Sequence, residues 1–273
     1  MKKVVLITGV GSGIGKASAE FLASNGFIVC ATTRNPINFT TTTYENLYFY
    51  QMDITNFLDV KKTIEVIVQT HGRIDILVNN AGYGLVSTVE DVEEKEMFDQ
   101  FNINVFGLLR VCKAAIPIMR EQKSGVIINI SSFLGKIGLP LLTFYNASKY
   151  AVEGITDSLR HELKSFNIRA HSIMPGFFNT NFAKDNLVVN NHIFDENSPY
   201  SKLIKTLTPT ILEQINNGND PALVAQIILD IIYDENYKAR TTAGEKASKF
   251  IPMKKELSDE DFEQRVREYY TFG

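Results

Sequence analysis

The sequence predicts a single α/β domain built as a doubly wound parallel sheet, and three observations lead to this fold class. The first is an apolar, β-rich run over Lys3–Thr8, which is typical of a strand buried on both faces. The second is a glycine-rich turn that follows it at once and passes into a helical pattern. The third is size, because 273 residues with 44% apolar side chains suffice for one large core.

The glycine-rich turn carries the first functional signal. It reads Gly9-Val-Gly-Ser-Gly13-Ile-Gly15, and glycines there let the backbone turn tightly and approach a pyrophosphate. Backbone NH groups and the positive end of the following helix would hold the phosphate charge. Three glycines alone occur in many tight turns, so the strand before and the helix after them carry the argument. The candidate cofactor residues here are Gly9, Ser12, Gly13, Ile14 and Gly15.

The remaining elements follow in an order that alternates strands and helices. Asn25-Gly26 is a typical helix stop, and the polar residues 36–45 indicate a surface loop. The stretch Gly84–Glu96 is polar and acidic, and we expect an exposed loop and a short helix there. The expected strands are Phe27–Thr32, Leu47–Met52, Ile74–Val78, Gly125–Ile130 and Ile168–Met174, and the expected helices start near Asn56, Phe98, Tyr145, Pro221 and Asp259.

The stretch Ser131–Lys149 carries the candidate chemistry. Tyr145 and Lys149 stand four residues apart, so in a helix both side chains leave the same face. A free phenol has a pKa of about 10, and a neighbouring ammonium favours its anion. Lowering that pKa to near 7 needs roughly 4 kcal/mol, which exceeds what one lysine supplies, so a cationic cofactor ring would have to contribute. Ser132 could hold a substrate oxygen, although a tyrosine–lysine pair by itself is a common solvated helix surface.

Together these motifs resemble the short-chain dehydrogenase/reductase family in its single-domain form. Beside the glycine turn, Asn79-Asn-Ala-Gly82 resembles the family's motif after the fourth strand, and Pro175-Gly176 with Thr180 resembles the segment at the nicotinamide end. The matches run in order from residue 8 to residue 180. The resemblance implies that Asn104, Ser132, Tyr145 and Lys149 are catalytic, and that Asp53, Ile54, Asn80, Ala81, Gly82, Tyr145, Lys149, Pro175, Gly176 and Thr180 bind the cofactor.

The end of the second strand favours NADP(H) over NAD(H). An NAD-binding fold usually has an acidic residue about 20 residues after the glycine turn, whereas a nearby arginine accommodates a 2′-phosphate. Here the stretch is Ala31-Thr-Thr-Arg34, and the next acidic residue is Glu45. Arg34 therefore offers a guanidinium to the phosphate. The alternative is that Arg34 is a solvated loop residue.

Two further residues have a structural alternative to their functional role. Asp53 would accept a hydrogen bond from the adenine, or belong to the turn or cap before the helix that starts near Asn56, or do both. Asn104 would support the proton relay and position Lys149, or be an ordinary buried amide.

Beyond Thr180 the resemblance weakens. Residues 181–218 mix polar residues with apolar ones, a composition suited to a lid that closes over an apolar substrate. Residues 238–273 form a charged tail with a last helix near Asp259–Tyr270, and this tail looks like that of the branch acting on retinoids and ketosteroids. The apolar residues expected at the substrate pocket are Phe133, Leu134, Ile137, Leu139, Leu141, Leu142, Phe182, Val188, Val189, Ile193, Phe194 and Tyr200.

Composition limits the classes of partner. A net charge of −3 and a pI near 5.9 give no basic patch for nucleic acid, and no apolar run reaches the length of a membrane span. The two cysteines, Cys30 and Cys112, fit neither a disulfide framework nor a metal motif, and the four histidines lack ligand spacing. We therefore expect a cytoplasmic protein without a metal. The helices after Phe98 and after Tyr145 are apolar nearly all round, and the family resemblance implies that they pair with a second copy in a homodimer or homotetramer. The alternative is that core packing alone explains them.

The sequence thus predicts an NAD(P)-dependent oxidoreductase acting on a secondary alcohol or carbonyl. The first alternative is a regulatory or scaffold protein that binds NAD(P) without turnover. The second is a nucleotide-sugar epimerase or dehydratase of the family's extended branch, whose glycine spacing and longer substrate domain are missing here.

Overall fold

A computed structural model describes residues 2–35, 43–180, 187–191 and 195–271. Its main feature is a seven-stranded sheet in which every neighbouring pair is parallel. The strand order is β3-β2-β1-β4-β6-β7-β9. The strands are β1 (Val4–Thr8), β2 (Ile28–Thr33), β3 (Leu47–Gln51), β4 (Ile76–Asn79), β6 (Gly125–Ile130), β7 (Ile168–Pro175) and β9 (Arg240–Ala243).

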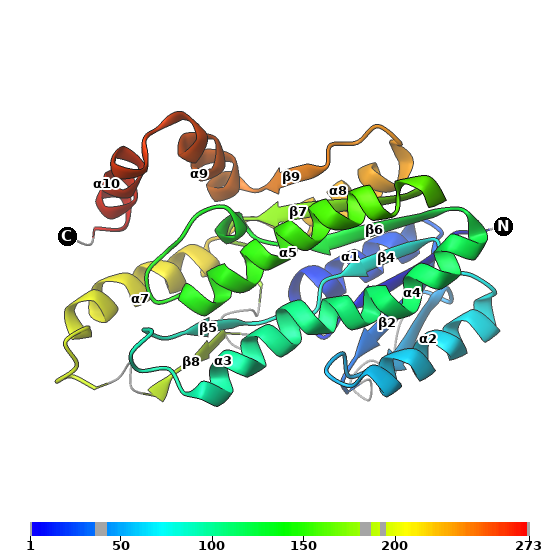
Figure 1. The fold of residues 1–273 in the computed structure, drawn as a ribbon, viewed down its shortest axis with the longest axis horizontal. Helices are drawn as coiled ribbons and strands as arrows, with labels where there is room; N and C mark the ends of the chain where they lie inside the picture. Colours follow the sequence, from blue (N-terminus) through cyan, green and yellow to red (C-terminus); the bar gives the residue numbers. More distant parts are fainter. Residues whose placement is uncertain (1, 36–42, 181–186, 192–194, 272–273) are drawn as a thin grey trace.

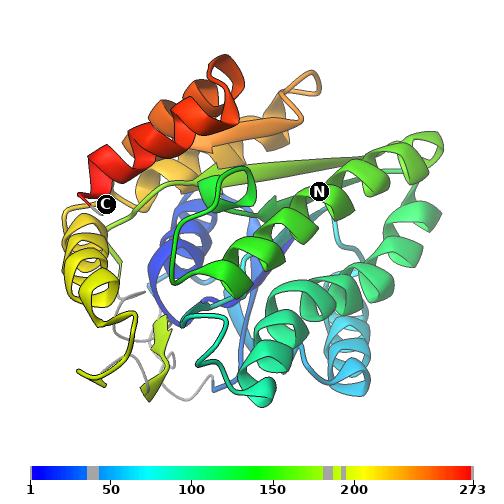
Figure 2. The same cartoon turned by 60° about the vertical axis from the view of Figure 1, so that its left-hand side comes forward.

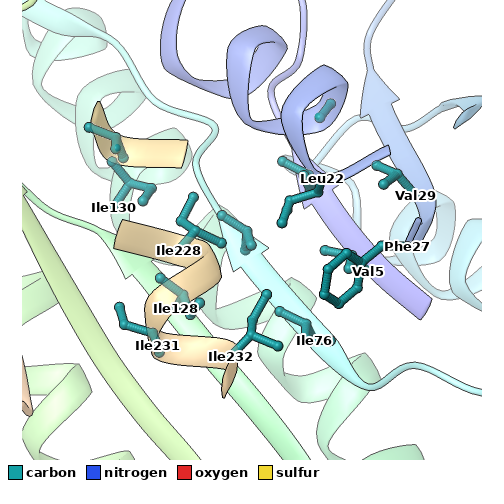
Figure 3. Packing of buried hydrophobic residues seen from close by; sticks show 14 of the residues in the cluster. Val5, Leu22, Phe27, Val29, Ile76, Ile128, Ile130, Ile228, Ile231 and Ile232 are labelled. Carbon is teal, nitrogen blue, oxygen red and sulfur yellow. The ribbon is translucent and has the colours of Figure 1, made fainter. Parts of the chain in front are cut away.

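Helices cover both faces of this sheet, which confirms the doubly wound fold (Figure 1). On one face lie α1 (Gly13–Ser24) and α8 (Ala222–Tyr233), and on the other lie α2 (Phe57–His71), α4 (Leu108–Gln122) and α5 (Thr143–Glu162). Figure 3 shows Leu22 of α1 and Ile228 of α8 facing sheet residues such as Val5. β1 and β6 are buried along their whole length because helices cover both of their faces.

The glycine turn lies where the strand order reverses. The chain runs from β1 outward through β2 to β3 and then returns to β4 on the other side of β1. Ligands of open parallel sheets bind in the crevice at such a switch point, beyond the carboxyl ends of the strands. The turns after β1 and β4 therefore border the same crevice.

A second, smaller layer lies beyond that edge of the sheet. It contains β5 (Gly84–Val86) paired in parallel with β8 (Leu187–Val189), together with α7 (Ser201–Asn216), α9 (Glu245–Glu256) and α10 (Asp259–Tyr270). Figures 1 and 2 show α7, in yellow, and α10, in red, at the same end of the molecule. Side chains from α7, α9 and α10 share one apolar cluster with the turn after β6.

Two expectations from the sequence, one for the stretch Gly84–Glu96 and one for the tail, are wrong. The stretch Gly84–Glu96 was expected to be exposed, but Gly84–Val86 is a buried strand. The tail was expected to contribute only a charged segment and a last helix, which α10 confirms, yet it also supplies β9 as the seventh strand and α9. Parts of the expected loop and lid, residues 36–42, 181–186 and 192–194, lie outside the described residues, and with them Phe182, Ile193 and Phe194.

The long helical stretch Glu94–Gln122 consists of α3 (Glu94–Phe101), a π-helical segment (Asn102–Gly107) and α4. By length and composition alone it would suffice to cross a membrane, so the expectation that no segment approaches this length is wrong. Core helices of soluble proteins meet the same criterion, and several side chains of α4 pack against the sheet.

Both cysteines are buried. Cys30 lies in β2 and Cys112 in α4, and burial raises the pKa of each thiol to about 12.

Candidate active site

The candidate catalytic residues line one cavity of about 820 Å³ at the carboxyl edge of the sheet. Tyr145 and Lys149 lie in the first two turns of α5, with the Lys149 Nζ 5.6 Å from the centre of the Tyr145 ring. Ser132 follows β6 and precedes a 3₁₀ turn, Phe133–Gly135. The cavity therefore brings together three of the four residues to which the sequence assigned catalysis.

Lys149 and Ser132 are each held by a backbone group. The Lys149 Nζ donates a hydrogen bond to the Ile130 carbonyl at 3.0 Å. The Ser132 Oγ accepts one from the Leu134 NH at 3.1 Å, and the Ser132 side chain also forms a hydrogen bond with Tyr145. Both side chains are buried, which keeps their positions fixed.

Asn104 lies within the π-helical segment and is 2% exposed. Its Oδ1 accepts from the Tyr83 NH at 3.0 Å, and its Nδ2 donates to the Tyr83 carbonyl at 2.9 Å and to the Ser148 Oγ at 3.0 Å. Asn104 thus ties the turn after β4 to the residue that precedes Lys149. Helical irregularities of this kind are frequent at functional sites.

Burial dominates the pKa values of Tyr145 and Lys149. Burial raises the pKa of Tyr145 to about 12, while a hydrogen bond with Ser132 acts in the opposite direction. Burial lowers the pKa of Lys149 to about 8, and the charge of Glu153 opposes that shift. The expected lowering of the Tyr145 pKa by Lys149 is therefore not found in the protein alone. Tyr145 keeps its proton at neutral pH.

The cofactor side is built around the glycine turn and Asn80. Gly9 and Gly13 have φ values of +72° and +58°, which favour glycine. The Asn80 Nδ2 donates to the Thr8 carbonyl at 3.0 Å and to the Gly9 carbonyl at 2.8 Å. The Thr8 Oγ1 accepts from the NH groups of Asn80 and Ala81, both at 3.1 Å. These bonds fix the turn after β1 to the turn after β4.

The start of α1 fits a bound phosphate. Gly11, Ser12, Gly13 and Ile14 line the cavity, and the first turn of the helix carries no acidic residue. The side chain of the N-cap residue Ser12 makes no capping hydrogen bond to the helix, and NH groups of a first helical turn are suited to bind an anion. A Cβ on Gly11 would meet only the Thr33 Oγ1, at 3.8 Å, which shows open space beside the turn.

Four more residues that the sequence analysis assigned to the cofactor also lie along the cavity. Arg34, Asp53, Ile54 and Gly82 all line the cavity. Asp53 also lies in the turn before α2, because its Oδ1 accepts from the Thr55 NH at 2.8 Å and from the Thr55 Oγ1 at 2.7 Å. The residue that caps α2 is Asn56.

Pro175, Gly176 and Thr180 line the cavity as well. Thr180 lies against the glycine turn, since a Cβ on Gly13 would be 3.1 Å from the Thr180 Cβ. Gly176 packs on the tail, because its Cβ would be 3.0 Å from the Ala247 nitrogen of α9. No pattern in the sequence predicted this contact with the tail.

The substrate side of the cavity is mainly apolar. Of the expected pocket residues, Phe133, Leu134, Leu142 and Val188 line it. The others that the structure describes do not, and Ile137, Leu139 and Leu141 are buried in the cluster behind the cavity. Lining residues that the sequence analysis missed are Leu85, Leu187, Ile211 and Ile215, from β5, β8 and α7. For Ile211 and Ile215, the helical spacing within α7 was the one available signal in the sequence.

Comparisons with known proteins agree with this architecture. The family model described as short chain dehydrogenase matches residues 3–188. A 3-ketodihydrosphingosine reductase from Bacteroides thetaiotaomicron is 35% identical over 273 residues, covering 98% of each chain. A 3-oxoacyl-(acyl-carrier-protein) reductase from Thermotoga maritima is 34% identical over 242 residues, covering 86% of this chain and 92% of the other.

Two solved structures extend the comparison. A short-chain dehydrogenase from Streptomyces avermitilis superposes with a TM-score of 0.84 at 30% identity and covers 99% of this chain and 97% of that one. ElxO with NADP bound has a TM-score of 0.71 at 29% identity, covering 89% of this chain and 97% of its own.

Proposed function

The chain belongs to the short-chain dehydrogenase family, and we propose that it moves hydride between NADP(H) and an apolar ketone or its secondary alcohol. One observation carries the proposal. Tyr145, Ser132 and Lys149 line a single cavity whose one side is the glycine turn and whose other side is apolar.

The residues of the chain handle the substrate oxygen and its proton. The bound nicotinamide cofactor supplies or accepts the hydride. Ser132 donates a hydrogen bond to the substrate oxygen, and the Tyr145 phenol gives a proton to that oxygen during reduction. The protonated state of Tyr145 at neutral pH favours this direction. Lys149, in its charged form, stabilises the phenolate that remains.

NADP(H) is the proposed cofactor because of Arg34. This exposed side chain lines the cavity beyond β2, and a guanidinium matches a phosphate in shape and charge. ElxO, a related structure, binds NADP according to its description.

The substrate we propose is a ketone with a long apolar chain. The apolar residues from β5, β8 and α7 support this class, as does the relative described as a 3-ketodihydrosphingosine reductase. A 3-oxoacyl thioester is the second candidate, from the relative described as a 3-oxoacyl-(acyl-carrier-protein) reductase.

The test combines binding and turnover. We expect tighter binding of NADPH than of NADH in a fluorescence titration, and oxidation of NADPH with 3-ketodihydrosphingosine but not with acetone. Tyr145→Phe is expected to bind NADPH normally while turnover falls by about 10²–10⁴-fold, because the proton donor is lost. Undiminished turnover in that variant would refute the mechanism. NADPH binding without turnover on any ketone would support a regulatory protein instead.

Exposed apolar side chains on the helices after Phe98 and Tyr145 support a homo-oligomer. Phe98, Phe106, Leu109 and Tyr150 are exposed on the stretch Glu94–Gln122 and on α5, where a second copy could cover them. Light scattering coupled to size exclusion measures the mass, and a monomer would contradict this assembly.

A further inference from the structure

We propose that Glu153, a buried carboxylate one turn beyond Lys149 on α5, is a positioning residue that keeps Lys149 charged and holds the Ser132 turn against the helix. This inference rests on the catalytic role proposed above for Lys149. The motifs and comparisons described above do not assign a role to Glu153.

Glu153 is a buried carboxylate with two cationic partners. Its side chain is 2% exposed. Arg240 donates from Nε to its Oε2 at 2.6 Å, and the Lys136 Nζ lies 3.6 Å from the same oxygen. Within the described residues its Oε1 has no hydrogen-bond partner. Burying a charge is costly unless it is paired, so the position of Glu153 indicates a specific use.

The two cations come from two different segments. Lys136 directly follows the 3₁₀ turn that begins after Ser132, and Arg240 is the first residue of β9 in the tail. The turn lies directly on α5 at this level, since a Cβ on Gly135 would be 3.2 Å from the Glu153 Cγ and 2.9 Å from the Lys149 carbonyl oxygen. Glu153 therefore joins the catalytic helix, the Ser132 turn and the tail.

The same carboxylate acts on Lys149 through its charge. Lys149 faces Tyr145 and Glu153 on its own helix, the Ile130 carbonyl on β6 and, across Gly82, the neutral amide of Asn104. Glu153 is the negative charge that opposes the effect of burial. Around Glu153 itself the charged groups are Lys149 and Asp157 from α5, Lys136 from the turn and Arg240 from β9.

Asp157 provides a matched control. It lies one turn further along α5 and forms an ion pair with the same Arg240, but its side chain is 51% exposed. Both residues have the same charge and share one partner. They differ in how much of the side chain is exposed and in how far along α5 each residue lies from Lys149.

The experiment compares the pH dependence of kcat/KM in Glu153→Gln and Asp157→Asn. Losing the Glu153 charge lowers the pKa of Lys149 further below about 8, so the ammonium is lost at a lower pH. We expect the alkaline limb of the Glu153→Gln profile to move toward lower pH by about one unit, and the Asp157→Asn profile to match the parent. Equal profiles in all three proteins would overturn the proposal.

A second comparison separates charge from packing. Glu153→Asp keeps the charge and changes the shape, whereas Glu153→Gln keeps the shape and loses the charge. Under the proposal the limb of the Asp variant lies between those of the parent and the Gln variant. A limb that moves more with Asp than with Gln would show a packing role only. If the Gln variant does not fold, a limb of the Asp variant that moves by a full pH unit or more, although the charge is kept, would overturn the proposal.

A direct titration completes the test without cofactor. The ¹³C signal of the Lys149 Cε in the apoprotein, assigned by its absence in Lys149→Met, should titrate at lower pH in Glu153→Gln than in the parent. Turnover that survives in Lys149→Met would refute the catalytic assignment. Lost turnover in Lys149→Met with an unchanged titration in Glu153→Gln would refute only the role of Glu153.

Discussion

The two sides of the cavity are held in place by different forces. On the cofactor side, Thr8 and Asn80 fix the glycine turn through hydrogen bonds that require particular residues at particular backbone positions. On the substrate side, α7, α9 and α10 are held by an apolar cluster that includes Phe250 and Tyr270. Such packing depends on volume rather than on identity. Substitutions should therefore affect ligand binding on the first side and stability on the second.

The largest effect is expected from Phe250→Ala. Phe250 is 1% exposed, and its ring centroid lies 5.0 Å from that of Tyr269, 6.0 Å from that of Tyr270 and 6.4 Å from that of Phe133. Truncation should lower the free energy of unfolding by about 3–5 kcal/mol, measured by urea denaturation. NADPH affinity of the folded variant should not change. Leu58→Ala, at a side chain that is 76% exposed, is the control with little effect on stability. A loss of NADPH affinity in Phe250→Ala would remove the contrast between the two sides.

Gly15→Ala, unlike Phe250→Ala, should weaken the binding of NADPH. A Cβ at Gly15 would lie 2.3 Å from the Gly9 carbonyl oxygen and 2.4 Å from the Asn80 Nδ2, so the turn must shift. We expect a loss of about 1–3 kcal/mol in stability together with a clear loss of NADPH binding. Gly154→Ala in α5 meets no atom within 4 Å and should instead gain about 0.5–1 kcal/mol. Normal NADPH affinity in Gly15→Ala would show that the turn does not need its observed geometry.

Arg34→Ala tests one contact of the cofactor side without disturbing the fold, because this side chain is exposed. Affinity for NADPH should fall about tenfold, or about 1.4 kcal/mol, through loss of a charge-assisted hydrogen bond. NADH affinity should stay constant, and Arg34→Lys should recover part of the loss since it keeps the charge. If Arg34→Ala weakened NADH and NADPH equally, the residue would not select between them.

Tyr270→Phe should have the smallest effect. Its hydroxyl is fully buried, and within the described chain it has no hydrogen-bond partner. Removing it should leave stability unchanged or raise it by under about 1 kcal/mol in thermal denaturation. The same chemical change at Tyr145 is expected to abolish most turnover. Marked destabilisation of Tyr270→Phe would show that the hydroxyl is bonded.

The sequence predicted the parts of this protein that depend on residue identity. The order of the glycine turn, Asn79-Asn-Ala-Gly82, Ser132, Tyr145 and Lys149 predicted both the fold and the position of the cavity, because backbone conformation and proton transfer restrict which residues can serve. The structure brings all of these segments to one edge of the sheet.

The sequence failed where an element depends on distant partners. β5 has three residues and β9 reads Arg-Thr-Thr-Ala, so neither is long or apolar enough to be recognised alone. Each is a strand because a remote strand, β8 or β7, pairs with it. The raised pKa of Tyr145 could not be predicted either, since it depends on burial that only the folded chain provides.

The buried cysteines make this protein a convenient background for spectroscopy. With pKa values of about 12 and side chains at most 2% exposed, the thiols of Cys30 and Cys112 offer almost no thiolate to an alkylating dye at neutral pH. A cysteine introduced on the exposed face of α10 would then carry the label alone. Distances between such a dye and the natural fluorescence of NADPH could report whether the tail and the cofactor approach each other during turnover.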